Sequence, residues 1–415
     1  MGKVLSGIVE ASEGQRDGIL HVIACLERPE KGHFMERVRA HGGEVMVCPG
    51  PRELAHEIAD SDIVQLEWWH HPSVAGWLGS GVLPAMRLVV WSHVSGIYVP
   101  YIPTGFLAAP MRFLFSSPCS WSRSDLMAFR AMDRRTIDVV FSFGGFDGLP
   151  GPPERSLRGA MRVGYLGSLN FAKLHPRFLD YVAAMPASQL PLTLIGDIAA
   201  AGPLLEEANR RGLAHRLDLR GYRTDAAAEL SALDVLAYLL NPLHYGTAEN
   251  ALLEAMAMGV VPIVLNNQAE RHLVRHGETG LVVESPDQFA AALGLLAKRP
   301  DELDRLSRKT SCEVRQRFSV HATAEQLRCH YRAVLAEPKR EWNFRSVFGA
   351  RPSDWFRSCL GPEAWRFHDD GSVDIRAQPA EILLEPNKGS VFHYRRFYPD
   401  DRRLAAWAEG LTACT

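Results

Sequence analysis

The seven cysteines of this chain form no closely spaced pair. They stand at positions 25, 48, 119, 312, 329, 359 and 414, without a CxxC or CxxH motif. Zinc sites and the disulfide frameworks of small secreted proteins depend on such spacings. We therefore expect reduced thiols, and neither a zinc site nor structural disulfides. No pair of aspartates indicates a metal either, so we predict no metal and no cofactor.

Long apolar runs, a signal peptide and a strong net charge are also missing. No run of 18 apolar residues occurs, so no membrane span is predicted. The first residues, MGKVLSGIVEASEGQRDG, lack a signal-peptide layout. A net charge of −2 gives no general attraction to nucleic acid or anionic membrane. We expect a cytoplasmic protein that binds no nucleic acid.

Strand-like and helix-like segments alternate along most of the 415 residues. We expect strands at 18–26, 44–48, 62–67, 87–92, 113–116 and 138–142, and then at 162–166, 192–195, 217–219, 235–239, 260–265 and 281–283. Helices are expected at 33–41, 52–60, 73–78, 174–185, 201–212, 225–232, 247–258, 268–276 and 286–297, with one or two long ones at 301–337. Such alternation predicts parallel sheets covered by helices on both faces.

The length and the linker signal predict a tandem arrangement. A proline- and glycine-rich segment lies at 149–160, and we place an interdomain linker at 151–160. The predicted parts are a first Rossmann-like domain (1–150, with an irregular start at 1–17), a second one (161–320), C-terminal helices (321–345) and an extension (346–415). The extension has strand-like runs at 373–375 and 391–394. It either wraps back on the first domain or forms an interface between subunits of a homo-oligomer.

The segment 241–267 combines loop, helix and strand in one apolar stretch. Thr247 is expected as N-cap of a helix, and residues 260–265 form a continuous apolar run typical of a buried strand. Glu254 lies among leucines, alanine and methionine on that helix. An unpaired buried carboxylate is costly, so Glu254 needs a partner, and ligand hydroxyls are one candidate.

Polar residues follow several strands of the second domain. Ligands of open parallel sheets bind beyond the carboxyl ends of the strands. Gly167 and Ser168 offer backbone amides there, and Lys173 is either a phosphate ligand or a surface lysine. Glu249 is predicted in the first turn of the helix, where either the helix dipole or a ligand explains it. Three further residues, placed after two other strands, contact a nucleotide base or simply form turns: Gly196, Tyr222 and Arg223.

The first domain has two candidate strand ends. The sequence Glu67-Trp-Trp-His-His71 follows one strand, and His93 follows its neighbour. A single histidine is usually structural, but two neighbouring strand ends with polar and aromatic groups favour a site.

Residues 18–335 resemble retaining glycosyltransferases of the GT-B fold, specifically family 4. LLEAMAMGVVPIVLNN resembles the helix and strand of that family's donor domain. RHLVRHGETGLVVESPD is similar to the segment that follows, and VGYLGSLNFAK to the family's phosphate-binding segment. LRGYRTDAAAELSALDVLAYLLNP resembles the stretch between them. The resemblance therefore implies two tandem Rossmann-like domains that face a cleft, with a C-terminal extension added.

The resemblance also implies roles for single residues. Lys173 matches the lysine that contacts the donor diphosphate, and Glu254 the glutamate that binds the donor ribose. His93 matches the histidine beside the transferred sugar. The segment that holds sugar and phosphates corresponds to Gly246, Thr247, Ala248, Glu249 and Asn250, and the base-contacting loop to residues 221–223.

Two charged residues of the family pattern are absent. The usual arginine would fall at or near Ser168, and Arg223 or Arg271 is then the substitute. The first of two glutamates would fall at Gly246, so either Glu249 takes over the sugar contact or the contact is missing.

The implied activity is metal-independent sugar transfer, with retention. The donor is a nucleotide diphosphate sugar (UDP or GDP), and the acceptor is the hydroxyl of a saccharide, a lipid-linked molecule or a small molecule. We place Glu67, Trp68 and His70 on the acceptor side of the site. The apolar, proline-containing residues 97–110 are either an acceptor loop or a shallow contact with the inner membrane face. The alternatives are a nucleotide-sugar epimerase or phosphorylase on the same fold, and a non-catalytic subunit.

Overall fold

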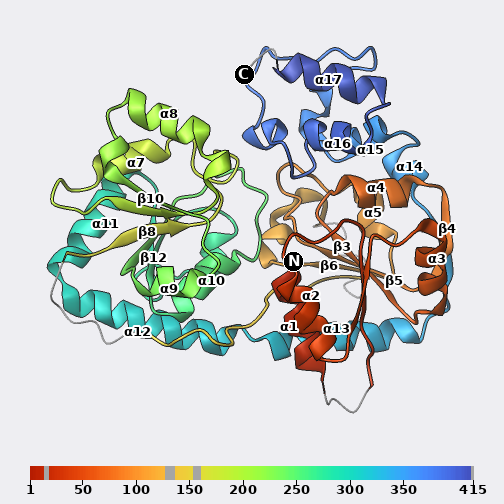
Figure 1. Ribbon diagram of the computed structural model, residues 1–415, viewed down its shortest axis with the longest axis horizontal. Coiled ribbons are helices and arrows are strands. Elements are labelled where there is room, and N and C mark those ends of the chain that lie inside the picture. Colours follow the sequence, from red (N-terminus) through yellow and green to blue (C-terminus); the bar gives the residue numbers. More distant parts are fainter. Residues whose placement is uncertain (14–17, 127–135, 153–159, 413–415) are drawn as a thin grey trace. The chain divides into compact units, whose positions relative to one another are not determined.

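The computed structural model in Figure 1 describes residues 1–13, 18–126, 136–152 and 160–412. Contacts divide the chain into two units. Unit 1 comprises Met1–Gly144, Tyr245–Ala248 and Val320–Thr415, and unit 2 comprises Gly145–His244 and Glu249–Ser319. Most of the predicted linker, 153–159, lies outside the described residues. The last part of the chain therefore joins unit 1.

Unit 2 contains a parallel sheet whose described strands number six. Their order is β10 (Leu217–Gly221), β9 (Leu192–Ile195), β8 (Val163–Leu166), β11 (Val235–Tyr238), β12 (Val261–Leu265) and β13 (Leu281–Val283). Every residue of β11 and β12 is buried, because apolar side chains there pack on both faces of the sheet. All six strands overlap the segments predicted from their apolar runs.

Helices cover both faces of this sheet, as Figure 1 shows for unit 2. They are α7 (Phe178–Ala184), η2 (Ile198–Ala200), α8 (Gly202–Arg210), η3 (Ala214–Arg216), α9 (Ala226–Ser231), α10 (Asn250–Ala257), η4 (Glu270–His272), α11 (Pro286–Lys298) and α12 (Pro300–Arg317). The helix predicted at 268–276 is wrong in length, because only the 3-10 turn η4 forms there. The carboxyl ends of the strands meet at one edge, where the loops between strands and helices gather.

Unit 1 has a parallel sheet with the order β3 (Val64–Trp68), β5 (Leu88–Ser92), β6 (Arg112–Phe115) and β7 (Ile137–Val139) among the described residues. Two further strands, β1 (Val22–Cys25) and β2 (Glu44–Val47), pair in parallel. Separately, β4 (Val82–Met86) pairs with β14 (Arg340–Asn343) in an antiparallel manner. The sequence analysis predicted neither β4 nor β14, because their pairing connects distant parts of the chain.

The helices of unit 1 surround these strands. They are α1 (Gly2–Ser12), α2 (His33–Ala40), α3 (Pro51–Asp60), α4 (Pro72–Gly79), α5 (Thr104–Ala108), η1 (Pro118–Ser122) and α13 (Val320–Leu335), followed by those of the extension. The long helices α12 and α13 confirm the prediction for 301–337. In the described part of the chain no helix is long and apolar enough to cross a membrane.

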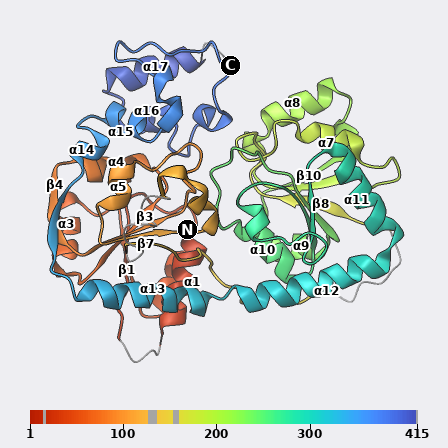
Figure 2. The same cartoon turned by 180° about the vertical axis from the view of Figure 1, so that it is seen from behind.

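The amino-terminal segment forms helix α1, so the prediction of an irregular start is wrong. Glycines, serines and β-branched residues give this segment weak intrinsic helix propensity. Its buried residues include Val4, Ile8 and Val9, which recur at helical spacing. Helix α1 lies against α2 and α13, and Figure 2 shows α13 passing beside it. Burial against helices distant in sequence therefore decides its structure.

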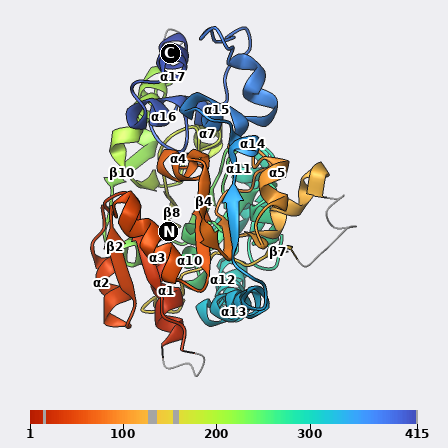
Figure 3. The same cartoon turned by 90° about the vertical axis from the view of Figure 1, so that its right-hand side faces the viewer.

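The extension packs on unit 1 as the first of the two alternatives predicted. Its helices are α14 (Arg345–Phe348), α15 (Pro352–Ser358), η5 (Gly361–Arg366), η6 (Glu381–Leu384), α16 (Val391–Phe397) and α17 (Arg402–Thr412). Helices α15 and α16 contact α4, as Figure 3 shows. The predicted strand at 391–394 is wrong, because Ser390 accepts a hydrogen bond from the backbone of His393 and starts a helix instead.

Histidines lie in the contact between α16 and the end of β3. The rings of His70 and His71 face Tyr394 and His393 respectively, with ring centroids 5.1 and 5.0 Å apart. His71 bonds Glu27 at 2.8 Å. Burial is the main cause that lowers the pKa of both His70 and His393, to about 3. The neighbouring His71 lowers both pKa values further. Arg396 and Lys388 also lower the pKa of His393. Both rings are therefore neutral in the folded chain.

Acidification is expected to destabilise unit 1 between about pH 6.5 and pH 3. In that range the unfolded histidines bind protons and the folded ones do not, so stability falls as pH falls, by about 1.4 kcal/mol per pH unit for each ring. All nine tryptophans belong to unit 1, so urea unfolding followed by tryptophan fluorescence reports it alone. His393→Gln should reduce the pH slope, whereas the exposed His33→Gln should leave it unchanged. Equal slopes in wild type and H393Q would contradict this assignment.

Candidate functional site

Two glycines bring the ends of β8 and β9 together in unit 2. A Cβ on Gly196 would lie 2.0 Å from the carbonyl oxygen of Gly167. Gly167 has φ +156°, and its own Cβ would lie 2.5 Å from the hydroxyl of Tyr165. The close approach of the two strand ends therefore leaves no room for a side chain at Gly196, and a contact of this residue with a nucleotide base stays a prediction. The exposed Ser168 follows Gly167, and its carbonyl accepts from Tyr165 at 3.0 Å.

Lys173 is held at the same edge by a buried carboxylate. Its Nζ donates to both oxygens of Glu249, at 2.8 and 2.7 Å. The side chain is only 14% exposed, so the interpretation as a surface lysine is wrong. Its backbone carbonyl accepts from the amide of Asn241 at 2.8 Å, which ties it to the loop after β11.

Glu249 immediately precedes helix α10, in a conformation that is rare for a residue with a side chain. Its φ and ψ are 42° and 58°, in the left-handed region. The helix begins at Asn250, so two predictions are wrong: Thr247 is not the N-cap, and Glu249 is not in the first turn. Left-handed residues other than glycine cost free energy and cluster at functional sites. Here the ion pair with Lys173 and a 2.5 Å bond from the Tyr238 hydroxyl hold Glu249 in place.

The electrostatics of this cluster keep Glu249 ionised. Burial alone raises the pKa of Glu249, but Lys173 and then His244 reverse this and hold the pKa at about 2, against an ordinary 4.5. Burial, followed by the charge of Glu249, raises the pKa of Tyr238 well above 10, so its hydroxyl remains a donor. The Lys173 ammonium and the Tyr238 hydroxyl therefore hold a negative charge directly before the start of α10.

A second buried carboxylate supports the first, and the sequence analysis missed it. Glu270 in η4 is fully buried, and its Oε1 lies 3.0 Å from Nε2 of His244. The other nitrogen of His244 lies 3.7 Å from Glu249, and Asn267 donates to Glu270 at 3.4 Å. His244 follows β11 and Glu270 follows β12, so polar residues after two adjacent predicted strands were an available signal.

Glu254 lies on α10, one turn beyond Glu249. The residues on both sides of it, Leu252, Leu253, Ala255 and Met256, are buried, while Glu254 itself is half-buried. The apolar neighbours of Glu254 in the sequence predicted a buried carboxylate. In the structure the side chain is partly open to solvent. Its role toward a ribose stays a prediction.

The loop after β10 is open to solvent. Tyr222 is 54% exposed, and Nε of Arg223 lies 3.2 Å from Glu229 in an exposed ion pair. Gly221 has φ +73°, which favours glycine and turns the chain. Arg271, the other candidate for the absent arginine, is exposed on η4. A base-contacting role for Tyr222 and Arg223 stays a prediction.

In unit 1, His93 and Glu67 meet at the ends of β5 and β3. Nε2 of His93 lies 2.5 Å from Oε2 of Glu67. The two other acceptor-side residues do not join them. Trp68 and His70 are 0% and 1% exposed and pack against aromatic rings of α5, α14 and α16. Their placement on the acceptor side is therefore wrong, because apolar burial under the extension accounts for both.

The short segment Tyr245–Ala248 belongs to unit 1. The Tyr245 carbonyl accepts from the amide of Ser95 at 3.1 Å. The Thr247 hydroxyl accepts from Ser116 at 2.8 Å and donates to the carbonyl of His93 at 3.4 Å. The sequence analysis placed Gly246, Thr247 and Ala248 with the donor-binding residues of the second domain. The structure groups these three residues with unit 1, and their contact with a donor stays a prediction.

The apolar stretch 97–110 contributes to the core of unit 1. Val99, Ile102, Phe106 and Leu107 are buried. The backbone amide of Tyr101 donates to the carbonyl of Cys359 in the extension at 2.7 Å. These four apolar side chains therefore pack inside the unit. They are not available as an exposed apolar surface, either for an acceptor or for a membrane.

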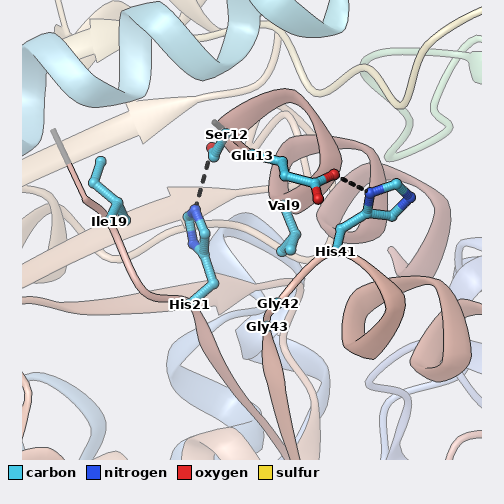
Figure 4. A pocket seen from close by; sticks show the side chains of 8 residues that line it. All are labelled: Val9, Ser12, Glu13, Ile19, His21, His41, Gly42 and Gly43. Atoms are coloured by element: carbon cyan, nitrogen blue, oxygen red, sulfur yellow. Dashed lines mark hydrogen bonds and ion pairs between the residues drawn. The ribbon is translucent and has the colours of Figure 1, made fainter. Parts of the chain in front are cut away.

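A small pocket in unit 1 lies away from these residues (Figure 4). It is lined by Val9, Ser12, Glu13, Ile19, His21, His41, Gly42 and Gly43. His21 bonds Ser12 at 3.3 Å and His41 bonds Glu13 at 2.5 Å. The pocket lies where β1 and β2 begin, whereas ligands of parallel sheets bind where strands end. It is therefore not a candidate site.

The model of the family described as glycosyl transferases group 1 matches residues 160–299, which include Lys173, Glu249 and Glu254. No curated protein matches the sequence.

Solved structures with a similar fold cover most of the chain. Anabaena HepE in complex with UDP-glucose is 16% identical, with a TM-score of 0.61 over 80% of this chain and 96% of its own. A glycosyltransferase from Rickettsia africae is 15% identical, with a TM-score of 0.60 over 81% and 96%. Sucrose-phosphate synthase from Thermosynechococcus elongatus is 16% identical, with a TM-score of 0.60 over 80% and 92%. The predicted fold class is confirmed: the chain is an α/β protein with parallel sheets, similar to GT-B glycosyltransferases with two Rossmann-like domains.

Proposed function

We propose that this protein transfers a sugar from a nucleotide diphosphate sugar to an acceptor hydroxyl. The observation that carries the proposal is the anion site of unit 2. There the largely buried ammonium of Lys173 pairs with the carboxylate of Glu249, directly before the start of α10 and at the strand ends where ligands of such sheets bind. The family match over 160–299 and the fold of HepE, which was solved with UDP-glucose, support the same activity.

Lys173 stabilises the departing diphosphate in this proposal. An ammonium has three N–H groups, and Glu249 accepts from Lys173 through both of its oxygens. We assign a remaining donor of Lys173 to a donor phosphate. Glu249 is then the residue that positions Lys173, rather than a ligand of the sugar. Preorganised charge of this kind lowers the barrier because it needs no rearrangement as the leaving group becomes negative.

The other candidate residues are assigned by their charge and by their position after a strand. Glu254 accepts hydrogen bonds from the donor ribose, and the exposed loop with Tyr222 and Arg223 contacts the base. His93 in unit 1 lies beside the transferred sugar. We propose retention of the anomeric configuration, which the resemblance implies. We also propose that no metal is needed, because Lys173 and the amides at the start of α10 offset the charge of the diphosphate. The acceptor is a saccharide, a lipid-linked molecule or a small molecule, at the inner membrane face if it is lipid-linked.

Calorimetry with a panel of UDP- and GDP-sugars tests the proposal directly. We expect one of them to bind, to raise the melting temperature, and to release its nucleoside diphosphate faster when sugar acceptors are added. EDTA should leave the rate unchanged, and NMR of the product should show the retained anomer. A chain that binds no nucleotide sugar in this panel would contradict the proposed function. Conversion of the donor without acceptor would instead indicate an epimerase.

One observation favours a second candidate, a non-catalytic subunit that binds a nucleotide sugar. Glu249 already neutralises Lys173, and Gly246 stands where a carboxylate was expected. Tight donor binding without transfer to any tested acceptor would support this alternative.

A further inference from the structure

We propose that Glu270 and His244 are positioning residues of the donor site in unit 2. Glu270 holds the ring of His244, and His244 holds the carboxylate of Glu249. Glu249 in turn directs the Lys173 ammonium toward the donor diphosphate. All four residues belong to unit 2. The inference rests on the proposed function for its effect on turnover, and on contacts within the unit for its geometry.

Glu270 lies at one end of this network. It follows strand β12, at the start of η4, and is fully buried. Its carboxylate accepts from Nε2 of His244, at 3.0 Å to one oxygen and 3.3 Å to the other, and from the side-chain amide of Asn267 at 3.4 Å. A carboxylate that has lost its hydration needs such donors. These contacts therefore fix which ring nitrogen of His244 faces Glu270.

His244 lies between two carboxylates. Its side chain is 2% exposed, and Nδ1 lies 3.7 Å from Oε1 of Glu249 while Nε2 faces Glu270. Burial raises the pKa of Glu249, but Lys173 and then His244 lower it to about 2. The contact with His244 therefore stabilises the ionised form of Glu249.

The backbone of Glu249 makes it the residue of the network that most depends on its neighbours. A left-handed conformation at a residue with a side chain persists only where the surroundings fix it. Its backbone carbonyl accepts from the amide of Leu253 at 3.1 Å. Its carboxylate is held by Lys173, Tyr238 and His244. Loss of the contact with His244 is therefore expected to let the carboxylate move, and the Lys173 ammonium with it.

The segment that carries His244 is also tied to the segment that carries Lys173. The backbone amide of Asn241 donates to the carbonyl of Lys173 at 2.8 Å, and its side-chain amide donates to the carbonyl of Phe171 at 2.8 Å. The backbone amide of His244 donates to the carbonyl of Asn241 at 3.0 Å. His244 is therefore linked to Lys173 twice, through the backbone of this turn and through the carboxylate of Glu249.

The consequence of this arrangement concerns the place of the Lys173 ammonium before the donor binds. A charge that is already in place needs no rearrangement as the diphosphate leaves. A displacement of about 1 Å can lower a rate on the order of 10²-fold. Glu270 and His244 touch no donor atom in this proposal and act through Glu249. Their loss should therefore lower kcat more than donor affinity.

Nitrogen NMR of the lysine ammonium groups, recorded on the full chain, tests the positioning without any substrate. Charge-assisted hydrogen bonds must open before an ammonium exchanges its protons, so we expect slow exchange at Lys173. The double variant Lys173→Met with Glu249→Gln identifies the signal by its loss. A wild-type Lys173 signal that exchanges as fast as those of exposed lysines overturns the proposal.

His244→Gln gives the sharper form of this test. Its amide can still donate to Glu270, but the ring nitrogen that faces Glu249 is gone. We expect the Lys173 signal to broaden or disappear at a temperature where the wild type retains it. His215→Gln, the same change at an exposed position on η3 of the same unit, should leave the signal unchanged. An unchanged Lys173 signal in folded H244Q overturns the proposal.

A kinetic cycle separates positioning from general damage to the fold. In H244Q and in the isosteric Glu270→Gln we expect kcat to fall roughly 10- to 10²-fold at saturating donor, with donor affinity little changed. Neither substitution should lower kcat further in the variant Lys173→Met with Glu249→Gln, where both charges on the route are already absent. A further loss of the same size in that background overturns the proposal, because a structural defect would act in either background.

Failure of the proposed function has a different signature. If no nucleotide sugar binds to the wild type, the proposed function is refuted, while the lysine NMR still decides whether His244 positions Lys173. If a nucleotide sugar is turned over, wild-type kcat in folded H244Q and E270Q overturns the positioning role and leaves the proposed function intact.

Discussion

Lys173→Ala is expected to lower turnover on the order of 10²- to 10³-fold at saturating donor, because the departing diphosphate loses its preorganised positive charge. The ammonium of Lys173 is largely buried and directed by Glu249, so water cannot replace it at the same place. Single-turnover release of the nucleoside diphosphate measures the effect. The exposed Lys298→Ala, on α11 of the same unit, is the matched control.

The same substitution leaves the buried carboxylate of Glu249 without its cation. Breaking a buried ion pair in this way typically costs about 3–5 kcal/mol of stability, so low activity alone would be ambiguous. The double variant Lys173→Met with Glu249→Gln removes both charges and should recover most of the stability, while turnover stays low. A folded double variant with wild-type turnover would remove Lys173 from the chemistry.

Glu254→Ala is expected to weaken donor binding about 10²-fold or more. A carboxylate that accepts from two ribose hydroxyls makes two charge-assisted bonds, each worth about 1.5–3 kcal/mol. Glu254 is half-buried, and Leu253 and Ala255 beside it offer no hydrogen-bonding side chain that could replace it. Calorimetry with the nucleotide sugar that wild type binds measures the loss.

Two controls distinguish the ribose contact from a change in the helix. Glu254→Gln keeps the shape of the side chain and should retain part of the affinity. Glu206→Ala removes an exposed carboxylate from α8 and should leave donor binding unchanged. Wild-type affinity in folded E254A would exclude Glu254 from the donor site.

The sheets were predictable because their signal is local. A strand that is buried on both faces needs a continuous apolar run, so β11 and β12 were recognisable from residues 235–239 and 260–265. The order of these runs also predicted parallel sheets, because the helical segments between them allow crossover connections. Candidate residues after the strands followed from the same rule.

The elements missed by the sequence analysis depend on distant partners. Helix α1 has weak propensity and forms against α2 and α13. Strand β4 exists because β14 pairs with it, and Trp342 donates to the carbonyl of Met86 across 256 residues of chain. No window of a few residues contains such partners, so periodicity cannot reveal them.

The role of Glu249 shows the same limit at the site. Its position beside a helix start was visible in the sequence, and both a dipole role and a ligand role were open. The structure adds the left-handed backbone of Glu249 and its ion pair with Lys173, 76 residues away. The carboxylate therefore has a protein partner that spacing did not suggest.

By itself, the sequence determined the α/β class and the strands of unit 2. It also placed Lys173, Glu249 and His93 after predicted strands, and Glu254 on the helix that follows one of them. Those depend on neighbouring residues, through apolar periodicity and turn chemistry. Only the tertiary structure decided that Glu249 holds Lys173, that Glu67 holds His93, and that the extension buries Trp68 and His70. Each of these is a contact between residues from different elements, and it forms only when burial brings those elements together.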